Sequence, residues 1–296
     1  MDTGFSQLHP AVQLLFFASV LTVTMMIMNP VLLIISSVSA LLYLAYYGGA
    51  DKIVRYLKTA FFSSVMIIVI NPLISHKGIT ILAYLPDGNP LTLESVIFGA
   101  AAAAMLSCVI FWFFTVNYIF TSDKVICLFG NFMPRIALLI SMTLNFTEKL
   151  KVQFMSVKAV QAEMGCDTKN GSVFTRIKNT VKVFSALIQW LMESSVDTAD
   201  SMNSRGYGLK KRTSYTVYRF FPRDIAAVVI IVIFDIAIIA SFCSGRFKYS
   251  YYPSFSVGKQ GALTFAAYVV FAALCIMPLT INFREDRKWK SLRSDI

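Results

Sequence analysis

The stretch that decides the fold is Ile225–Phe242, IAAVVIIVIFDIAIIASF, in which Asp235 is the only charged residue. A helix that crosses the apolar core of a bilayer needs roughly 20 consecutive, mostly apolar residues. The stretch therefore predicts a membrane-spanning helix. The composition agrees, because 56% of the 296 residues are hydrophobic and only 15% are charged, whereas soluble proteins carry about 25% charged residues.

Similar apolar stretches occur on both sides of this one, and together they predict about six spans. The pair Asn29-Pro30 separates the first two, because proline disfavours a helical residue before it and favours a helix start. We therefore expect an all-α fold, a polytopic membrane helix bundle. The other predicted spans are Ala11–Met28, Val31–Tyr47, Ala60–Ile70, Ser95–Phe120 and Ala262–Ile281.

The formal net charge is +11, and Lys and Arg gather between the spans and near the C-terminus. In membrane proteins these residues accumulate on the cytoplasmic side. The basic loop Gly48–Lys58, the segment Thr121–Asp224, the tail Arg284–Arg293 and both termini are therefore predicted to be cytoplasmic. The predicted regions are a four-span region at 1–120, a cytoplasmic region at 121–224, and two spans with a basic tail at 225–296.

The predicted cytoplasmic region contains two long amphipathic helices that end at glycine. The first runs from Glu148 to Gly165 and the second from Val173 to Arg205. Before them, the interrupted apolar stretch Val125–Phe146 is expected to be a helix that lies at the membrane interface or packs beneath the bundle. The stripes at helical spacing are Leu150, Phe154, Val157, Val160 and Met164 in the first, and Phe174, Ile177, Val181, Phe184, Ile188, Leu191, Ser195, Ala199 and Met202 in the second.

Arg205 stands at the end of the second helix, directly before Gly206. Its planar guanidinium can donate several hydrogen bonds across an interface, and its charge complements the helix macrodipole. Because glycine lets the chain turn away, we expect the side chain at an exposed tip that could enter a groove on a partner protein. An ordinary C-terminal cap with a solvated cation is the alternative.

The segment Ser201–Tyr207, SMNSRGY, resembles a motif of the transmembrane T component of energy-coupling factor (ECF) transporters, the EcfT/CbiQ family. In that family two long cytoplasmic coupling helices each end in Ala-Arg-Gly, and here Ser204 replaces the alanine. Val160–Asp167, VQAEMGCD, occupies the place of the first motif. It keeps the Gln, the Gly and the Asp, but Met164 stands where the family has Arg.

Two further segments are similar to the same family. Pro134–Met142 resembles the stretch before the first coupling helix, and Leu91–Glu94 resembles a Thr-x-Glu-Gly region without its glycine. Met105 is a departure, since the family tends to carry an Arg in this region. The resemblance extends from about Leu8 to the fifth predicted span.

The resemblance implies a non-catalytic scaffold in the cell membrane of a prokaryote. Two ABC-type ATPase subunits would bind the helix tips, and a separate substrate-binding S component would take up a vitamin or metal ion. ATP and Mg²⁺ would be held by the ATPases, with no cofactor bound by this chain. The implied coupling residues are Ser204, Arg205 and Gly206 at one tip and Met164 and Gly165 at the other.

Met164 predicts that the two tips differ in strength. A methionine side chain can fill a groove, but it cannot pair with a carboxylate as arginine does. We therefore expect Arg205 to dominate the contacts with the ATPases.

Asp235 is a candidate functional residue, because carboxylates within membrane spans are costly and often mark transport pathways. A protonated or hydrogen-bonded structural role, facing Asn117 or a serine, is an equal alternative. A self-sufficient secondary carrier that uses Asp235 is therefore a second hypothesis, although we find no convincing internal inverted repeat.

Other classes of function find less support in the sequence. A membrane-embedded transferase would need clustered carboxylates for a metal near phosphates, and Glu193, Asp197 and Asp200 are better explained as a solvated helix face. The two histidines are far apart in sequence, so no protein-built metal site is expected. The aromatic and basic segment Tyr215–Arg223 adjoins a hydrophobic span, so no nucleic-acid partner is expected.

Overall fold

The computed structural model describes residues 4–75, 78–84, 90–166, 172–208, 218–253, 256–257 and 261–294. The chain forms two compact units: Met1–Val125 with Tyr218–Ile296 is the first, and Ile126–Val217 is the second. All six predicted spans belong to the first unit, and both predicted amphipathic helices belong to the second. The functional division at residues 120 and 224 and the cytoplasmic location of the termini remain predictions.

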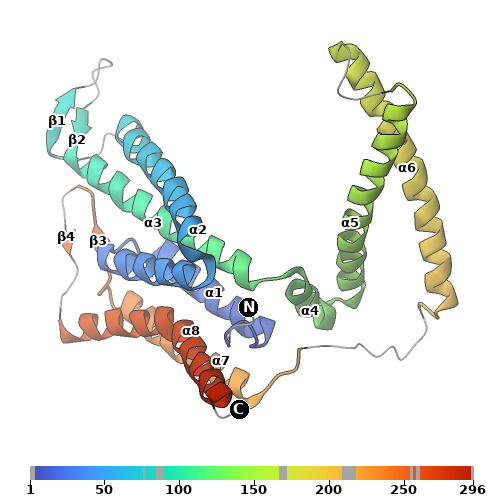
Figure 1. The fold of residues 1–296 in the computed structure, drawn as a ribbon. Coiled ribbons are helices and arrows are strands. Elements are labelled where there is room, and N and C mark those ends of the chain that lie inside the picture. Colours follow the sequence, from blue (N-terminus) through green and yellow to red (C-terminus); the bar gives the residue numbers. More distant parts are fainter. Residues whose placement is uncertain are drawn as a thin grey trace. The chain divides into compact units, whose positions relative to one another are not determined.

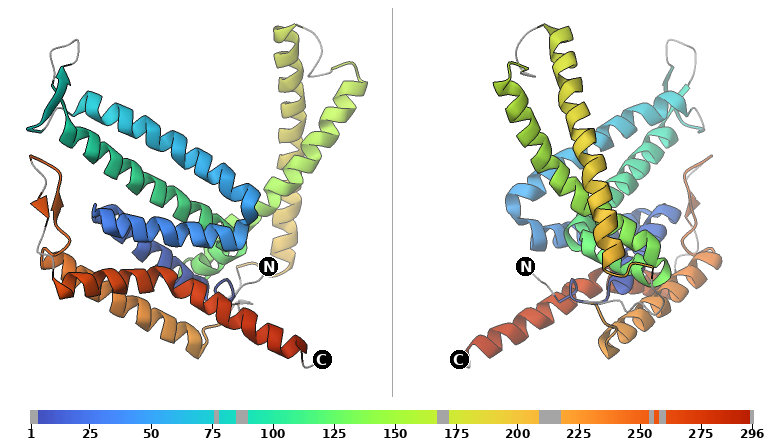
Figure 2. Two further views of the ribbon diagram at one scale, coloured as in Figure 1. Left: turned by 60° about the vertical axis from the view of Figure 1, so that its left-hand side comes forward. Right: turned by 90° about the vertical axis from the view of Figure 1, so that its right-hand side faces the viewer.

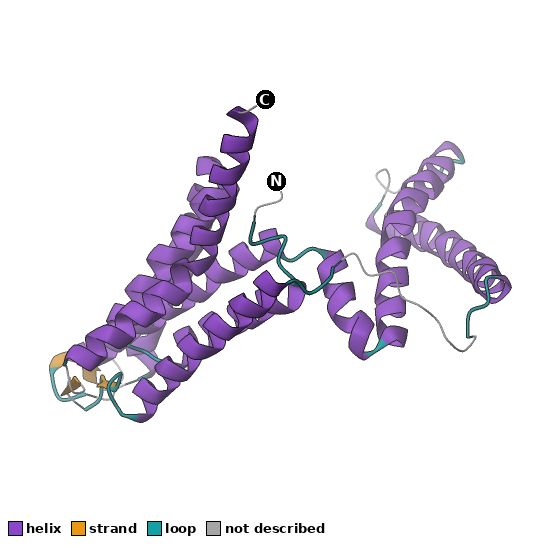
Figure 3. Ribbon diagram, turned by 90° about the horizontal axis from the view of Figure 1, so that it is seen from below, coloured by secondary structure: helices purple, strands orange, loops and turns teal. Residues whose placement is uncertain are grey.

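The first unit is built from helices (Figure 1), and the predicted all-α class is confirmed for the described residues. Two short antiparallel strand pairs connect helices (Figure 3): β1 (Ile81–Tyr84) with β2 (Pro90–Thr92), and β3 (Tyr249–Ser250) with β4 (Ser256–Val257). The helices of this unit are α1 (Pro10–Met26), α2 (Pro30–Ile74), α3 (Leu93–Ile119), α7 (Pro222–Cys243) and α8 (Ala262–Ser294).

Five helical segments of the described chain are long and apolar enough to cross a membrane. A sixth apolar helix, α1, has 17 residues, and at 1.5 Å per residue it measures about 26 Å, somewhat less than the hydrocarbon core of roughly 30 Å. The fold is therefore a polytopic membrane helix bundle, as predicted. The five segments are Pro30–Tyr47, Ile53–Ile74, Leu93–Ile119, Pro222–Cys243 and Ala262–Ser291.

The predicted loop Gly48–Lys58 is wrong, because these residues are helical. α2 continues without interruption over 45 residues, and Figure 2 shows its two halves meeting at a sharp bend. Glycine pairs allow a helix to bend without ending it, and Gly48-Gly49 lies between the two apolar halves. The charged residues therefore mark a boundary between two spans, although the helix continues through it.

A second correction concerns Val125–Phe146, which we expected to form one helix, at the interface or beneath the bundle. Instead α4 (Ser122–Phe132) ends before Met133, whose φ of −139° and ψ of 78° are not helical, and α5 (Pro134–Glu163) begins at the next residue. Proline at the first helical position explains this break, because it disfavours helical geometry in the residue before it. The first amphipathic helix therefore starts at Pro134 rather than at Glu148.

Side-chain caps fix the beginnings of α1 and α2. The imidazole Nδ1 of His9 accepts a hydrogen bond from the Ala11 N–H at 3.2 Å, and the amide oxygen of Asn29 accepts one from the Val31 N–H at 3.0 Å. Burial lowers the pKa of His9 below its usual range, while the nearby Asp224 carboxylate acts in the opposite direction. The net shift favours the neutral imidazole, which is the form that can accept the capping hydrogen bond.

The core of the first unit is centred on α1, which contacts α2, α3 and α7. Phe16 and Phe17 of α1 meet Trp112 of α3 edge-on, with ring centroids 5.9 and 6.1 Å apart. The fully buried indole of Trp112 donates a hydrogen bond from Nε1 to Ser36 Oγ of α2 at 2.9 Å. One side chain therefore links three helices through both apolar and polar contacts.

A buried polar network lies at one end of this unit. The amide nitrogen of fully buried Gln13 donates to carbonyl oxygens within the segment Phe5–Leu8 at 2.8 to 3.1 Å. Its amide oxygen accepts a hydrogen bond from Lys124 Nζ at 3.0 Å, and the same ammonium donates to the Ile119 carbonyl at 2.8 Å. Gln13 thereby connects the N-terminal segment with the end of α3 and stabilises a buried lysine.

We predict that Gln13→Leu destabilises the first unit by about 2–4 kcal/mol, because it leaves the buried ammonium and carbonyl groups short of hydrogen bonds. The melting temperature in detergent should fall by roughly 5 °C or more. Gln7→Leu is the matched control, because Gln7 belongs to the same segment but is exposed. Equal melting temperatures for the two variants would contradict the structural role given to Gln13.

Candidate functional site

The second unit contains the two long amphipathic helices, α5 and α6 (Val173–Ser204). Their 30 and 32 residues correspond to lengths of about 45 and 48 Å. The two helices contact each other and run in opposite directions (Figure 2). The C-terminal end of α5 therefore lies toward the beginning of α6, and the C-terminal end of α6 lies at the other end of the pair.

The side chains buried on α6 recur at intervals of four residues. They are Asn179, Val183 and Leu187, which lie on one face of the helix. On α5 the predicted apolar residues Leu150, Phe154 and Val157 are half-buried. These are the faces that the second unit covers by its own packing.

A different face of α6 carries the predicted apolar stripe, and the first five residues of this stripe are exposed. Val181 lies two residues before Val183, which corresponds to about 200° around a helix. Val181 is 61% exposed, whereas Val183 is completely buried. The described residues therefore leave uncovered an apolar surface, which we call the α6 stripe. Its members and their exposed fractions are Phe174 (79%), Ile177 (57%), Val181 (61%), Phe184 (57%) and Ile188 (43%).

Both helices end with the same backbone geometry. Gly165 and Gly206 have φ values of +78° and +80°, in the left-handed region that favours glycine. After α5, the N–H groups of Gly165 and Cys166 donate to the carbonyls of Ala162 and Gln161 at 3.1 and 2.9 Å. This is the pattern of a Schellman motif, in which the backbone satisfies the last carbonyl groups of the helix.

The end of α6 repeats the motif residue for residue. The N–H groups of Gly206 and Tyr207 donate to the carbonyls of Asn203 and Met202, both at 3.0 Å. The predicted helix ends at glycine are therefore confirmed. Arg205 occupies the same C-cap position in α6 that Met164 occupies in α5.

The side chains at these two equivalent positions are available to a partner. Met164 is 71% exposed, and Arg205 is exposed and makes no ion pair with the described residues. The Ser204 hydroxyl donates to the Asp200 carbonyl at 2.9 Å within α6, so it does not restrain the guanidinium. The structure thus places Ser204, Arg205 and Gly206 together at one end and Met164 with Gly165 at the other.

The backbone motif alone does not identify a functional end. α7 finishes in the same way: the N–H groups of Gly245 and Arg246 donate to the Phe242 and Ser241 carbonyls at 2.9 and 3.3 Å, and Gly245 has a φ of +71°. The ends of α5 and α6 differ from this one in their C-cap side chains, because α7 has Ser244 there. The side chain at the C-cap is therefore the feature that could specify a contact.

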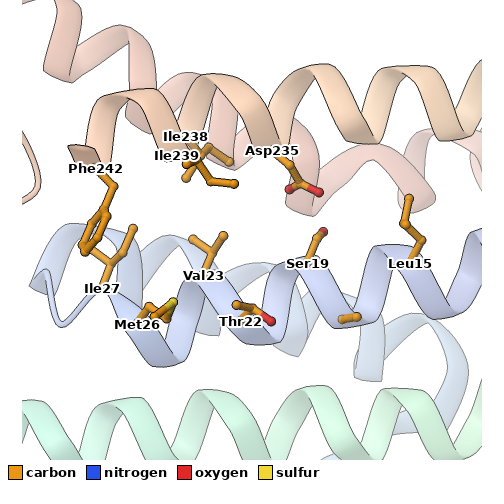
Figure 4. A pocket seen from close by; sticks show the side chains of 11 residues that line it. Leu15, Ser19, Thr22, Val23, Met26, Ile27, Asp235, Ile238, Ile239 and Phe242 are labelled. Atoms are coloured by element: carbon orange, nitrogen blue, oxygen red, sulfur yellow. The ribbon is translucent and has the colours of Figure 1, made fainter. Parts of the chain in front are cut away.

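Asp235 lies in the first unit. Of the two partners expected for it, Asn117 or a serine, the structure places a serine opposite the carboxylate. It faces Ser19 of α1 across a groove (Figure 4). Asn117 is exposed on α3 and is not among the residues that line this groove. The polar residues of α1 at this groove, Ser19 and Thr22, were not singled out from the sequence, although their three-residue spacing in an apolar helix was a visible signal.

The remaining predicted residues bear less on the site. Glu193, Asp197 and Asp200 are exposed along α6, and no group of three or more metal-ligating side chains occurs in the described parts of the chain. Asp167 of the first family-like segment and the residues 215–217 lie outside the described residues.

Comparisons with known proteins give partial matches. No protein-family model matches the chain. It is 29% identical over 103 residues to the energy-coupling factor transporter transmembrane protein EcfT of Limosilactobacillus fermentum, and 29% identical over 97 residues to the EcfT of Lactobacillus helveticus. It is also 26% identical over 104 residues to an uncharacterized protein of Mycoplasma pneumoniae, the MG181 homolog.

The extent of these matches is limited. They cover 34%, 32% and 35% of this chain, and 39%, 35% and 24% of the respective relatives. The chain therefore spans well under half the length of the curated relatives it matches. It is similar to EcfT over about a third of its sequence, and this supports the resemblance to a membrane component of ECF transporters.

We predict that Gly206→Val loosens the end of α6, because a β-branched residue is strained at a φ of +80° by roughly 1–2 kcal/mol. Hydrogen exchange of the Tyr207 amide should become about 5- to 30-fold faster by the same estimate. Gly206→Asn is the matched control, because asparagine tolerates left-handed geometry. Unchanged exchange in Gly206→Val would mean that the positive φ does not hold this end.

Proposed function

We propose that the chain is the transmembrane scaffold subunit of an ECF-type ABC importer. It would couple ATP hydrolysis by two partner ATPases to a separate membrane subunit that binds the substrate. The observation that carries the proposal is the matched pair of helix ends in the second unit, which present Met164 and Arg205 at equivalent C-cap positions. The similarity to EcfT over about a third of the chain also supports it.

The proposed chemistry at the end of α6 is recognition by charge and shape. A guanidinium at the last helical residue can donate to carboxylates or carbonyl groups in a groove of an ATPase. The backbone turns away at Gly206, so the side chain projects beyond the helix. The α6 helix, about 48 Å long and in contact with α5, would transmit the movement of the ATPase as a rigid lever.

The α6 stripe suits contact with the substrate-binding subunit. Exposed apolar patches of this kind mark surfaces that bind proteins or membrane. The α6 stripe would contact an apolar surface of the substrate-binding subunit, and that subunit alone would bind the substrate. In this scheme ATP and Mg²⁺ belong to the ATPases, the chain binds no cofactor of its own, and the vitamin or metal ion is not recognised here.

A self-sufficient carrier is the second candidate, and Asp235 in its groove is the observation that favours it. Such a carrier would move its substrate without ATPases. Liposomes that contain the purified chain alone distinguish the two functions, because the scaffold requires its partners. A membrane-embedded transferase receives no comparable support from the residues around Asp235.

We predict that Arg205→Glu disrupts the assembly with the ATPases. Co-purification from detergent after co-expression with the candidate ATPases of the host should fall about tenfold or more, since a desolvated charge contact is worth roughly 2 kcal/mol or more. Lys178→Glu makes the same change in charge on an exposed part of α6 away from the tip and should retain the ATPases. Equal loss in both variants would mean that net charge, and not the tip, decides assembly.

We further predict that the two tips contribute unequally. Arg205→Ala should reduce the recovered ATPase several-fold, because it removes a charge-assisted contact, whereas Met164→Ala should reduce it less than about threefold, since it removes only apolar packing. Quantitative immunoblots of the same co-purification provide the measurement. If the two alanine variants lose the ATPases equally, the idea of one dominant tip fails.

A further inference from the structure

A groove runs along the first unit between α1 and α7 (Figure 4). It has a volume of about 350 Å³, and its lining is apolar apart from three polar side chains: Ser19, Thr22 and Asp235. On α1 and its C-cap the lining extends from Leu15 to Ile27, thirteen residues that span about 18 Å. The groove is therefore long and narrow, and it lies parallel to the two helices.

One oxygen of the carboxylate in this groove lacks a hydrogen-bond donor among the described residues. The Oδ1 atom of Asp235 is buried and has no hydrogen-bond partner among the described residues. Ser19 faces the carboxylate and interacts with it, but the Ser19 hydroxyl donates a hydrogen bond to the Phe16 carbonyl at 3.0 Å. A hydroxyl group has a single proton to donate, and the Oδ1 atom is left without a donor from the described residues. Burial of such a group without a partner is costly.

The depth of Asp235 limits what could supply the donor. It lies thirteen residues after Pro222 and eight before Cys243, the ends of α7, or about 20 and 12 Å along the helix. A carboxylate at this level of a spanning helix lies within the hydrocarbon core, away from the charged headgroups. The acyl chain of a lipid could fill the groove, but it offers no donor.

The shape of the groove fits a row of side chains from a third helix. Helices pack by placing ridges of side chains into the grooves of a neighbour, and small residues allow the close approach that membrane helices need. On α1 the lining includes Ala18, Ser19 and Thr22. The rim residues Met26, Ile239 and Phe242 are exposed by 69%, 57% and 45%, so the groove opens to the outside of the unit.

We propose that this groove is an intramembrane docking site for one transmembrane helix of a partner membrane protein. That helix presents a hydrogen-bond donor, Lys or Arg above all, to Asp235 near the middle of the bilayer. Apolar side chains of the same helix fill the groove on both sides of this contact. The inference does not depend on the ATPase contacts, because it concerns only α1 and α7.

The test uses a model transmembrane helix as the probe. The purified chain, labelled with a fluorescence donor, is reconstituted in liposomes with an acceptor-labelled Leu-rich peptide of about 20 residues. The peptide carries Lys, Asn or Leu at its centre. We expect saturable energy transfer in which the Lys peptide binds about 5- to 30-fold more tightly than the Leu peptide, as one polar contact in a membrane is worth about 1–2 kcal/mol.

Two variants locate the contact. Asp235→Leu should bind the Lys and Leu peptides equally. The double variant Ile233→Asp/Asp235→Ile keeps one carboxylate on α7 but moves it about 200° around the helix, to a position that is 56% exposed. It should also lose the preference for Lys. A preference that survives in this double variant would overturn the groove as the site, because any intramembrane carboxylate would then suffice.

Peptide binding to the wild-type chain tests the proposal even if a variant does not fold. Equal binding of the Lys and Leu peptides to wild type would overturn it. Saturable binding of decylamine to wild type without binding of any peptide would also overturn it, because the groove would then be a site for a small amphiphilic cation. Loss of the ATPases in Arg205→Glu with an intact Lys preference would show that the two contacts are separate.

Discussion

The first unit depends on the hydrogen bond between Gln13 and Lys124, because a buried ammonium must be paired or solvated by protein groups. Gln13 supplies one oxygen at 3.0 Å, and the Ile119 carbonyl supplies another at 2.8 Å. The amide nitrogen of Gln13 donates hydrogen bonds to carbonyl groups in the segment Phe5–Leu8. The N-terminal segment, the start of α1 and the end of α3 are therefore held at one point, one residue before the boundary of this unit at Val125.

The two units differ in how far their own helices cover their apolar side chains. In the first unit, α1 is surrounded by α2, α3 and α7, and Trp112 links three helices at the core. In the second unit, α6 buries only Asn179, Val183 and Leu187, while the α6 stripe is uncovered by the described residues. A helix with apolar residues on two opposite faces can pack on its own chain with one face and on another molecule with the other.

The sequence predicted those features that follow from local chemistry. The apolar composition of Ile225–Phe242 was sufficient to predict α7, and Gly165 and Gly206 were sufficient to predict the ends of α5 and α6. The loop at Gly48–Lys58 was wrong because a glycine pair can bend a helix as well as end it. The start of α5 was misplaced because the apolar character of Val125–Phe146 was given more weight than the break that Pro134 imposes.

The features that were not predicted depend on how helices are rotated and packed. The spacing of Phe174, Ile177 and Val181 shows that they share a face, but it does not reveal whether this chain or another molecule covers that face. In the same way, Asp235 was recognised as unusual, but its position opposite Ser19 follows from the contact between α1 and α7. Only three-dimensional packing could select Ser19 over Asn117.

The Schellman ends of α5 and α6 have a consequence for how such a protein can diversify. Main-chain hydrogen bonds satisfy the last carbonyl groups at both ends, with glycine providing the turn. The side chain at the C-cap takes no part in those bonds, so a different side chain there leaves the capping hydrogen bonds in place. Met164 and Arg205 therefore occupy equivalent C-cap positions. A substitution at either position can strengthen or weaken the contact of that tip with a partner, while both helices keep their length and ending.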